Sequence, residues 1–312
     1  RVLWCSIRAL VERYSFVRCH VYTGDAADGD AILERAKERF NIDLAGAVDF
    51  VPLRRRRWVE AETWPRFTLL GQSLGSVWLG LEALTSFVPD VYIDSMGYAF
   101  TLPLFKWFGR CRVGCYVHYP TISTDMLERV SSREAAFNNA AFIAKSRVLS
   151  AGKMIYYQLF AALYGFAGRC ADCVMVNSSW TKNHIVSLWK VPSKTAVVYP
   201  PCDISGLAVE ELRDLPGAKN THLIVSVAQF RPEKNHELQL EAMAELFKRS
   251  SKRREGVRLV LVGGCRNAED ERRVDNLKKK AAELGIQGHV RFEVNVTYTR
   301  LRELLTSATI GL

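Results

Sequence analysis

Residues 222–249 read HLIVSVAQFRPEKNHELQLEAMAELFKR, and this stretch decides the predicted fold. Its first six residues form an apolar, β-branched run that is typical of a buried strand. Four apolar residues then recur at the i, i+3, i+4 and i+7 spacing of one helix face: Leu240, Met243, Ala244 and Phe247. A helix is therefore predicted over 234–249. A strand followed at once by an amphipathic helix is the repeating unit of a parallel sheet covered by helices.

The same alternation runs through all 312 residues. Apolar or β-branched runs predict strands at Val17–Tyr22, Ala47–Pro52, Asp90–Asp94, Arg112–Val117, Asp172–Asn177, Thr195–Tyr199, His222–Val227, Arg258–Val262 and Val290–Glu293. Helical patterns lie between them, so the fold class is α/β, with doubly wound, Rossmann-like sheets. This length exceeds what one hydrophobic core serves. A polar, Pro- and Gly-containing stretch from Tyr199 to Asn220 is the candidate linker, and it predicts domains at 1–203 and 204–312.

The chain carries 43 Lys and Arg against 33 Asp and Glu, a net charge of +10 that favours an anionic partner. Charge alone leaves nucleic acid, a phosphorylated metabolite and an anionic membrane open. Three basic runs, 54–57, 252–254 and 278–280, lack interleaved aromatic residues and any RNA-binding signature. Solvated faces or contacts to an anionic membrane explain these runs as well as nucleic acid does, and no nucleic-acid partner is expected.

Eight cysteines are too few for a disulfide-built scaffold and indicate thiols in a reducing compartment. Cys170 and Cys173 form a C-x-x-C, which Cys111 and Cys115 could complete to four zinc ligands. The irregular spacing favours buried thiols instead, and no metal site is predicted.

Ligands of open α/β sheets collect at the carboxyl ends of strands. His118 follows the strand that ends at Val117, and Pro120 stops that strand, so an imidazole stands at the strand tip. This ring could contact a bound sugar or its phosphate. The alternative is a capping histidine or one satisfied within the core.

A second strand leads into Arg231 and Lys234 at the predicted helix start. Two cations there oppose the helix dipole unless they share an anion, and with free backbone N–H groups they would bind a diphosphate well. The alternative is a solvated pair neutralised by Glu233. Gly263 and Gly264 follow another strand and allow a ligand to approach the backbone closely.

Two further features leave their roles open. Ser178 or Ser179 can cap the helix after the strand that ends near Asn177, and the glycosylation sequons starting at Asn177 and Asn295 are expected to stay unused. The apolar segments 67–87 and 154–166 are either ordinary core helices or helices that lie in a membrane interface.

Five motifs, taken in order, point to one family: DSMGYAFT at 94–101, YVHYPTISTDM at 116–126, VMVNSSWT at 174–181, VYPPCD at 198–203 and QFRPEKNH at 229–236. Together they closely resemble the GDP-mannose-dependent α-1,2-mannosyltransferases that extend a dolichol-diphosphate-linked Man3GlcNAc2 oligosaccharide in asparagine-linked glycosylation. The resemblance covers essentially the full chain. It implies a retaining, family 4 glycosyltransferase of GT-B fold, with two Rossmann-like domains facing a cleft.

The resemblance also implies partners and location. Residues 204–312 would hold GDP-mannose and 1–203 the dolichol-linked acceptor, which receives its fourth and fifth mannoses on the cytosolic face of the endoplasmic reticulum membrane. Other mannosyltransferases of the pathway are possible partners. No cofactor and no divalent metal are expected.

Individual roles follow from matched motif positions. Lys234 matches the lysine that binds the donor diphosphate, and His118 matches the histidine that faces the transferred sugar. The wider superfamily commonly has Arg where Gln229 stands, so Arg231 is expected to supply the displaced charge. Gly263 and Gly264 match the strand end near the nucleotide.

The family's glycine-rich loop and first strand are expected before Arg1, and its E-x7-E element after Leu312. On this reading the chain is truncated at both ends, and the 312-residue chain alone is expected to be inactive. Two alternatives stay open: a related GT-B transferase that uses another sugar nucleotide, and a truncated form that acts only in membrane docking or scaffolding.

Overall fold

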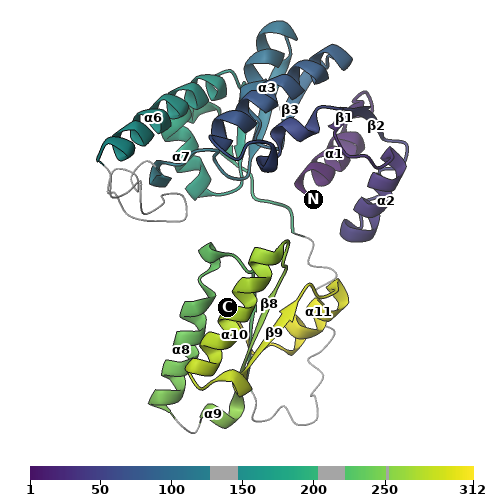
Figure 1. Cartoon of the computed structure of the whole chain (residues 1–312). Helices are drawn as coiled ribbons and strands as arrows, with labels where there is room; N and C mark the ends of the chain where they lie inside the picture. Colours follow the sequence, from purple (N-terminus) through teal and green to yellow (C-terminus); the bar gives the residue numbers. More distant parts are fainter. Residues whose placement is uncertain (127–146, 203–221, 251–252) are drawn as a thin grey trace. The chain divides into compact units, whose positions relative to one another are not determined.

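The structure, a computed structural model, describes residues 1–126, 147–202, 222–250 and 253–312. The chain divides into two compact units, Arg1–Cys202 and Asp203–Leu312 (Figure 1). The predicted boundary was one residue later. Most of the candidate linker lies outside the described residues.

The first unit is built on parallel sheets. One sheet has the order β3-β4-β5-β6, from Val91–Asp94, Arg112–Val117, Cys173–Val176 and Thr195–Val197. A two-stranded parallel sheet, β1 (Cys19–Thr23) with β2 (Val48–Pro52), completes the strands of this unit. The hydroxyl of Tyr22 in β1 donates to the carbonyl of Phe87, just before β3, at 2.6 Å. The longer helices are α1 (Val2–Arg13), α2 (Gly29–Phe40), α3 (Thr68–Ser86), α6 (Arg147–Arg169) and α7 (Ser179–Trp189).

The main core of the first unit lies beneath β4. Val113, Cys115 and Val117, at every second position of this strand, are buried against Phe105 and Tyr164. Because side chains alternate across a strand, this spacing brings one face of β4 to the core. Phe105 belongs to a single π-helical turn, Leu104–Phe108.

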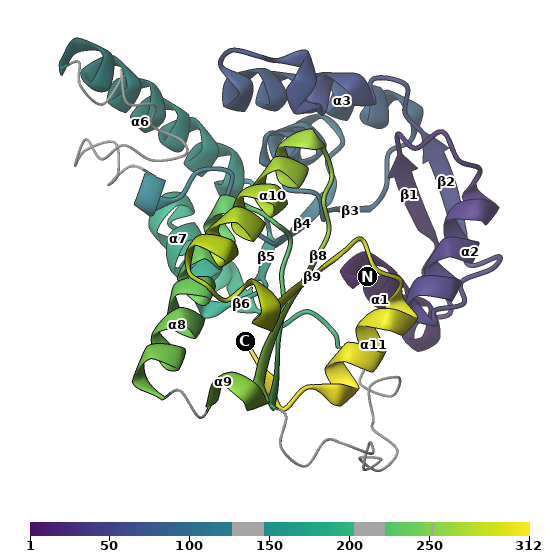
Figure 2. The same cartoon turned by 60° about the horizontal axis from the view of Figure 1, so that its bottom comes forward.

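The second unit is a four-stranded parallel sheet of order β10-β7-β8-β9. Its strands are Ile310–Gly311, His222–Val227, Val257–Gly263 and Val290–Val294. Helices α8 (His236–Arg249) and α10 (Ala268–Glu283) cover one face, α11 (Tyr298–Ser307) covers the other, and α9 (Arg253–Gly256) is a short turn, as Figures 1 and 2 show.

The pattern of β8 explains why both faces are covered. Leu259 and Leu261 pack in the cluster with α8 and α10, whereas Val260 and Val262 pack with Leu304 of α11. A strand that is apolar at consecutive positions needs helices on both sides. The predicted doubly wound arrangement is confirmed in this unit.

All predicted strands are present, with ends shifted by at most two residues. The helix predicted over 234–249 starts later than expected. Pro232–Lys234 form a 3-10 turn, Asn235 adopts the left-handed conformation with φ of 45°, and α8 begins at His236. Lys234 therefore belongs to the turn before the helix.

Candidate functional site

A cavity of about 690 Å³ lies at the carboxyl edge of the second unit's sheet. Its lining residues end β7 and β8, follow β7, β8 and β9, or lie in α11 and in the turn before α8: Val227, Ala228, Gln229, Lys234, Val262, Gly263, Gly264, Asn295, Val296 and Leu301. This edge is where parallel α/β sheets bind ligands, and the volume is in the range of small-molecule sites. We call it the donor cavity.

Four of the predicted donor residues line this cavity: Gln229, Lys234, Gly263 and Gly264. Lys234 is exposed and makes no ion pair within the described part of the chain. Its backbone N–H donates to the carbonyl of Arg231 at 3.1 Å, which closes the 3-10 turn. The turn thus presents an ammonium group that is available to an anion.

Gly263 and Gly264 serve different purposes. A Cβ on Gly263 would stand 2.0 Å from the carbonyl oxygen of Ala228, so only glycine allows the ends of β7 and β8 to come this close. A Cβ on Gly264 would meet nothing nearer than the Oδ1 of Asn295, at 3.5 Å. Gly263 is required by the fold, whereas Gly264 leaves room beside the cavity.

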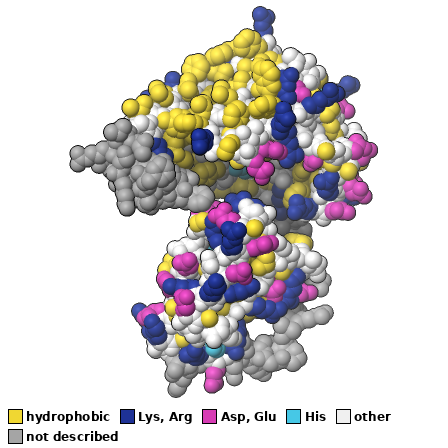
Figure 3. All heavy atoms as spheres, in the orientation of Figure 1, with side chains coloured by type: hydrophobic (Ala, Val, Ile, Leu, Met, Phe, Trp, Pro, Cys, Tyr) yellow, Lys and Arg dark blue, Asp and Glu magenta, His cyan; other side chains and the backbone are white. Residues whose placement is uncertain are grey.

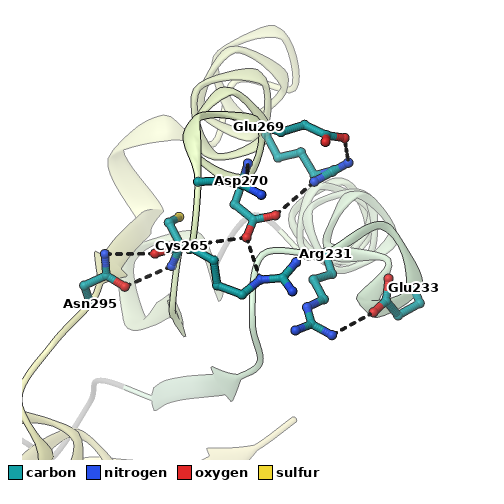
Figure 4. Close-up of polar contacts among 9 residues, drawn as sticks. Arg231, Glu233, Cys265, Glu269, Asp270 and Asn295 are labelled. Atoms are coloured by element: carbon teal, nitrogen blue, oxygen red, sulfur yellow. Dashed lines mark hydrogen bonds and ion pairs between the residues drawn. The ribbon is translucent and has the colours of Figure 1, made fainter. Parts of the chain in front are cut away.

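Asn295 was not predicted as a site residue, yet it lines the donor cavity. Its backbone is left-handed, with φ of 53°, and its side chain bridges to the loop after β8: Oδ1 accepts from Cys265 N at 2.9 Å, and Nδ2 donates to Cys265 O at 3.3 Å (Figure 4). Thr297, the third sequon residue, caps α11 by accepting from Arg300 N at 3.2 Å. Both sequon side chains therefore hold local structure.

Arg231 lies apart from the donor cavity. It lines a second hollow, of about 290 Å³, together with His236 and Arg273. One of its terminal nitrogens is 3.7 Å from a carboxylate oxygen of Glu233, and its Nε is buried without a hydrogen-bond partner (Figure 4). Arg231 and Lys234 therefore line different hollows, and a shared anion between these two cations stays a prediction.

Asp270 organises the start of α10 beside this second hollow (Figure 4). Its buried carboxylate accepts from the backbone N–H and the Nε of Arg266, each at 3.1 Å, and from Arg273 at 3.1 Å. The backbone hydrogen bond from Arg266 is the main cause that lowers the pKa of Asp270. Arg266 and Arg273 are thus committed to this carboxylate.

In the first unit, His118 stands where it was predicted, exposed directly after β4. Its ring centroid is 4.8 Å from that of Tyr116, and no hydrogen bond to its imidazole is found in the described ranges. Partial burial lowers the pKa of His118 below its ordinary value of 6.5. The ring is therefore neutral at pH 7 and available to a ligand hydroxyl.

Ser178 caps α7, as predicted, because its hydroxyl accepts from Thr181 N at 3.2 Å. Among the proposed zinc ligands, Cys111 and Cys115 are buried as expected, whereas Cys173 is exposed at the start of β5. The described residues contain no group of three or more His, Cys, Asp or Glu side chains that could hold a metal ion.

Comparison with known families places the chain. The family described as "ALG11 mannosyltransferase N-terminus" matches residues 1–189, and "Glycosyl transferases group 1" matches 209–311. The chain belongs to the ALG11 mannosyltransferase family.

Relatives in this family match the chain from end to end. The proteins named GDP-Man:Man(3)GlcNAc(2)-PP-Dol alpha-1,2-mannosyltransferase are 56% identical in Homo sapiens, 55% in Mus musculus and 46% in Dictyostelium discoideum, each over 100% of this chain. The chain spans 64% of the human and mouse proteins and 63% of the Dictyostelium protein.

Solved structures agree on the fold. A UDP-forming trehalose-phosphate synthase from Burkholderia xenovorans matches with a TM-score of 0.63 at 13% identity, and an apo structure of OtsA with 0.62 at 12%. Each match covers 95% of this chain and 77% of the solved chain. The predicted GT-B fold is confirmed.

Proposed function

We propose that this chain is part of an enzyme that transfers mannose from GDP-mannose, in α-1,2 linkage and with retention, to a dolichol-diphosphate-linked Man3GlcNAc2 acceptor. The observation that carries the proposal is the identity of 55–56% over the whole chain to mammalian proteins of that name. The product would carry the fourth and fifth mannoses of the oligosaccharide.

The donor cavity supports the donor half of the reaction. The bond between the anomeric carbon of mannose and the diphosphate oxygen breaks, and negative charge grows on the departing GDP. Lys234 lines the cavity without a carboxylate partner in the described residues, so its ammonium can stabilise this charge. Because the protein supplies this cation, we propose that transfer requires no divalent metal and no other cofactor.

Retention follows if the acceptor hydroxyl attacks on the face from which GDP departs. The hydroxyl oxygen then bonds to the anomeric carbon, and its proton passes to the leaving phosphate. We assign the neutral imidazole of His118 to contact with the transferred mannose. Gln229 and Gly264 line the donor cavity and are assigned to GDP-mannose, whereas a donor role for Arg231 stays a prediction.

The first unit supports the membrane half of the proposal. Large apolar side chains of α3 and α6 are exposed at i, i+4, i+8 and i+11, which places them on one stripe of each helix. The stripes consist of Leu70, Leu74, Trp78 and Leu81 in α3, and Ile155, Leu159, Leu163 and Phe166 in α6.

Aromatic residues beside these stripes make ring contacts with α6. Phe67 meets Tyr156 of α6 at 5.8 Å between ring centroids, and the exposed Trp107 meets Phe166 at 5.7 Å. Figure 3 shows the resulting continuous hydrophobic area on the first unit, with basic side chains at its margin. We call the two stripes with Phe67 and Trp107 the apolar face.

The side of α3 that faces the interior of the first unit carries small residues instead of large apolar ones. Gly71 and Gly75 face Trp64 and Trp58 so closely that a Cβ would stand 2.3 Å and 1.9 Å from their atoms. Small residues inside and large apolar residues outside reverse the pattern of a soluble amphipathic helix. The guanidinium of Arg55 lies 4.6 Å from the Trp78 ring, so a basic group stands at the edge of the apolar face.

A lipid bilayer is the partner that fits apolar stripes with basic edges, because helices can lie in its interface while cations meet anionic headgroups. No helix in the described ranges is long and apolar enough to cross a bilayer. We therefore propose that the apolar face rests on the cytosolic leaflet of the endoplasmic reticulum membrane, where the dolichol-linked acceptor and other mannosyltransferases of the pathway would be met.

The apolar face also favours a second candidate function, membrane docking or scaffolding without transfer. A transfer assay separates the two, with the intact protein, GDP-mannose and a lipid-linked Man3GlcNAc2 acceptor in vesicles. The mannosyltransferase proposal expects turnover that persists in EDTA, and it expects UDP-sugars to compete poorly.

The key variant in this assay is Lys234→Ala. We expect the activation barrier to rise by about 2–4 kcal/mol, the range seen when a charge-stabilising group is lost. Lys279→Ala, which removes an exposed lysine on α10 outside the cavity, is the matched control and should leave the rate unchanged. Vesicle binding with no turnover by the wild-type protein would favour the docking function instead.

A further inference from the structure

A pair of exposed aromatic rings stands at the carboxyl edge of the first unit's sheet, one residue beyond His118. The rings of Tyr119 and Trp180 are stacked, with centroids 5.2 Å apart and planes 29° from parallel. Tyr119 is 61% exposed and Trp180 40%. The two residues meet because Tyr119 follows β4 and Trp180 follows β5, which are neighbours in the sheet.

Trp180 packs on a histidine that is itself held by polar contacts. Trp180 lies in the first turn of α7, and its ring meets that of the buried His184 edge-on at 4.1 Å. The Nδ1 of His184 is hydrogen-bonded to the hydroxyl of Thr124 at 2.7 Å, and its Nε2 is 3.7 Å from a carboxylate oxygen of Asp125. A binding surface that is fixed before its ligand arrives loses less entropy on binding.

The surroundings of the pair distinguish it from the apolar face. Asp125 is half exposed, and the polar side chains of Asn177, Ser178 and Thr181 line the start of α7 next to Trp180. A pyranose ring has an apolar C–H face and a rim of hydroxyl groups. Aromatic rings bury the C–H face through dispersion contacts. A carboxylate accepts charge-assisted hydrogen bonds from the hydroxyl groups.

We propose that Tyr119 and Trp180 form a stacking platform for a sugar ring of the acceptor oligosaccharide, with Asp125 accepting from that sugar's hydroxyl groups. The platform rests on the proposed function, since it assigns part of the acceptor site to the sheet edge that carries His118. It would determine affinity for the oligosaccharide without touching the donor.

The direct test varies the concentration of lipid-linked Man3GlcNAc2 at saturating GDP-mannose, with the intact protein. Trp180→Ala and Tyr119→Ala should each raise the acceptor KM about tenfold, the usual cost of removing an aromatic anchor. The KM for GDP-mannose should stay unchanged. Trp180→Phe keeps a stacking ring and should restore most of the acceptor affinity.

Trp107→Ala is the matched control, because it removes an exposed indole (53%, against 40% for Trp180) from the apolar face. This variant should weaken vesicle binding and leave the affinity for a soluble oligosaccharide unchanged. An acceptor KM that stays at the wild-type value in both alanine variants overturns the platform, and so does a parallel rise in the KM for GDP-mannose, which would indicate a structural role.

A binding measurement keeps this test separate from the proposed function. Free Man3GlcNAc2 is titrated into the wild-type protein and observed by saturation-transfer NMR, where the aromatic protons of the pair should transfer magnetisation to the sugar. If the protein binds this oligosaccharide through Trp180 but transfers nothing, the platform stands and the transferase proposal fails. If it transfers mannose and both alanine variants bind the oligosaccharide like wild type, the platform fails alone.

Discussion

At the scale of single residues, the donor cavity depends on backbone positions that differ in what they tolerate. Gly263 is fixed by the carbonyl of Ala228, whereas a Cβ on Gly264 would make only an ordinary van der Waals contact, with Asn295. Asn295 lies in the loop after β9 and makes two hydrogen bonds to Cys265 in the loop after β8. The shape of the cavity is thus set by close backbone approach and by one amide side chain.

The two glycines give a paired prediction. Gly263→Ala forces the ends of β7 and β8 apart and should lower the free energy of unfolding by about 1–3 kcal/mol, as overpacking does. Gly264→Ala should change stability by less than about 0.5 kcal/mol but weaken GDP binding, because its methyl group enters the donor cavity. Urea unfolding and calorimetric GDP titration measure both. Equal destabilisation by the two variants would contradict this division.

His236 gives a prediction for pH. Burial, followed by the charge of Lys234, lowers the pKa of this imidazole below its ordinary value of 6.5. The unfolded chain therefore takes up a proton near pH 6.5 that the folded chain accepts only at lower pH. Above pH 6.5 the folded protein keeps the whole stability that neutral His236 contributes. This contribution is lost as the pH falls through the pKa of His236 in the folded state.

Chemical unfolding between about pH 7.5 and 5.5 measures this loss. His236→Phe, which keeps a ring against Phe230, should show a shallower decline than wild type. Burial also lowers the pKa of His118 and His289, so the variant should retain part of the pH dependence. An unchanged slope in the variant would show that His236 does not contribute.

At the scale of elements, the turn before α8 separates two cations that the sequence places side by side. Helical periodicity predicted a helix from residue 234, but left-handed Asn235 interrupts it, and Arg231, before the turn, lines the second hollow. Asparagine tolerates this conformation better than most residues, so its identity was the available signal. Tertiary packing determines whether the chain turns at such a residue. Helical periodicity carries no information about that packing.

The apolar face is the other feature that belongs to elements, and it predicts how the protein meets lipid. Burying one leucine side chain contributes about 1.5–3 kcal/mol, so Leu159→Glu should reduce partitioning onto vesicles at least about tenfold. Leu238→Glu on α8 is the matched control, because Leu238 is nearly as exposed (58% against 62%) but lies in the second unit. Co-sedimentation with vesicles containing anionic lipid measures this, and equal losses would rule out a specific docking face.

At the scale of the whole molecule, the sequence predicted the sheets well because each strand is a short apolar run between helical patterns. The consecutive apolar residues of β8 indicated that helices cover both of its faces. The motifs that span the chain indicated the GT-B fold. The carboxyl-edge rule singled out Lys234 and the glycine pair, and the family resemblance added Gln229; all four line the donor cavity. Asn295 directly follows β9 and also fits this rule, but in the sequence it was considered only as the start of a glycosylation sequon.

The aromatic platform was missed because the sequence does not show which strands are neighbours in the sheet. Tyr119 and Trp180 lie in separate motifs and meet only because β4 and β5 are neighbours. Each residue alone is an ordinary exposed aromatic side chain. The pairing of strands gives the two rings a common role.

The central claim is that the diphosphate of the donor is held at the carboxyl edge of the second unit's sheet by Lys234. A structure of the intact protein with bound GDP tests it most directly. We expect diphosphate oxygens within hydrogen-bonding distance of the Lys234 ammonium, with the nucleotide between Gln229 and Gly264. A diphosphate bound in the hollow of Arg231 and Arg273, with Lys234 left in solvent, would contradict it.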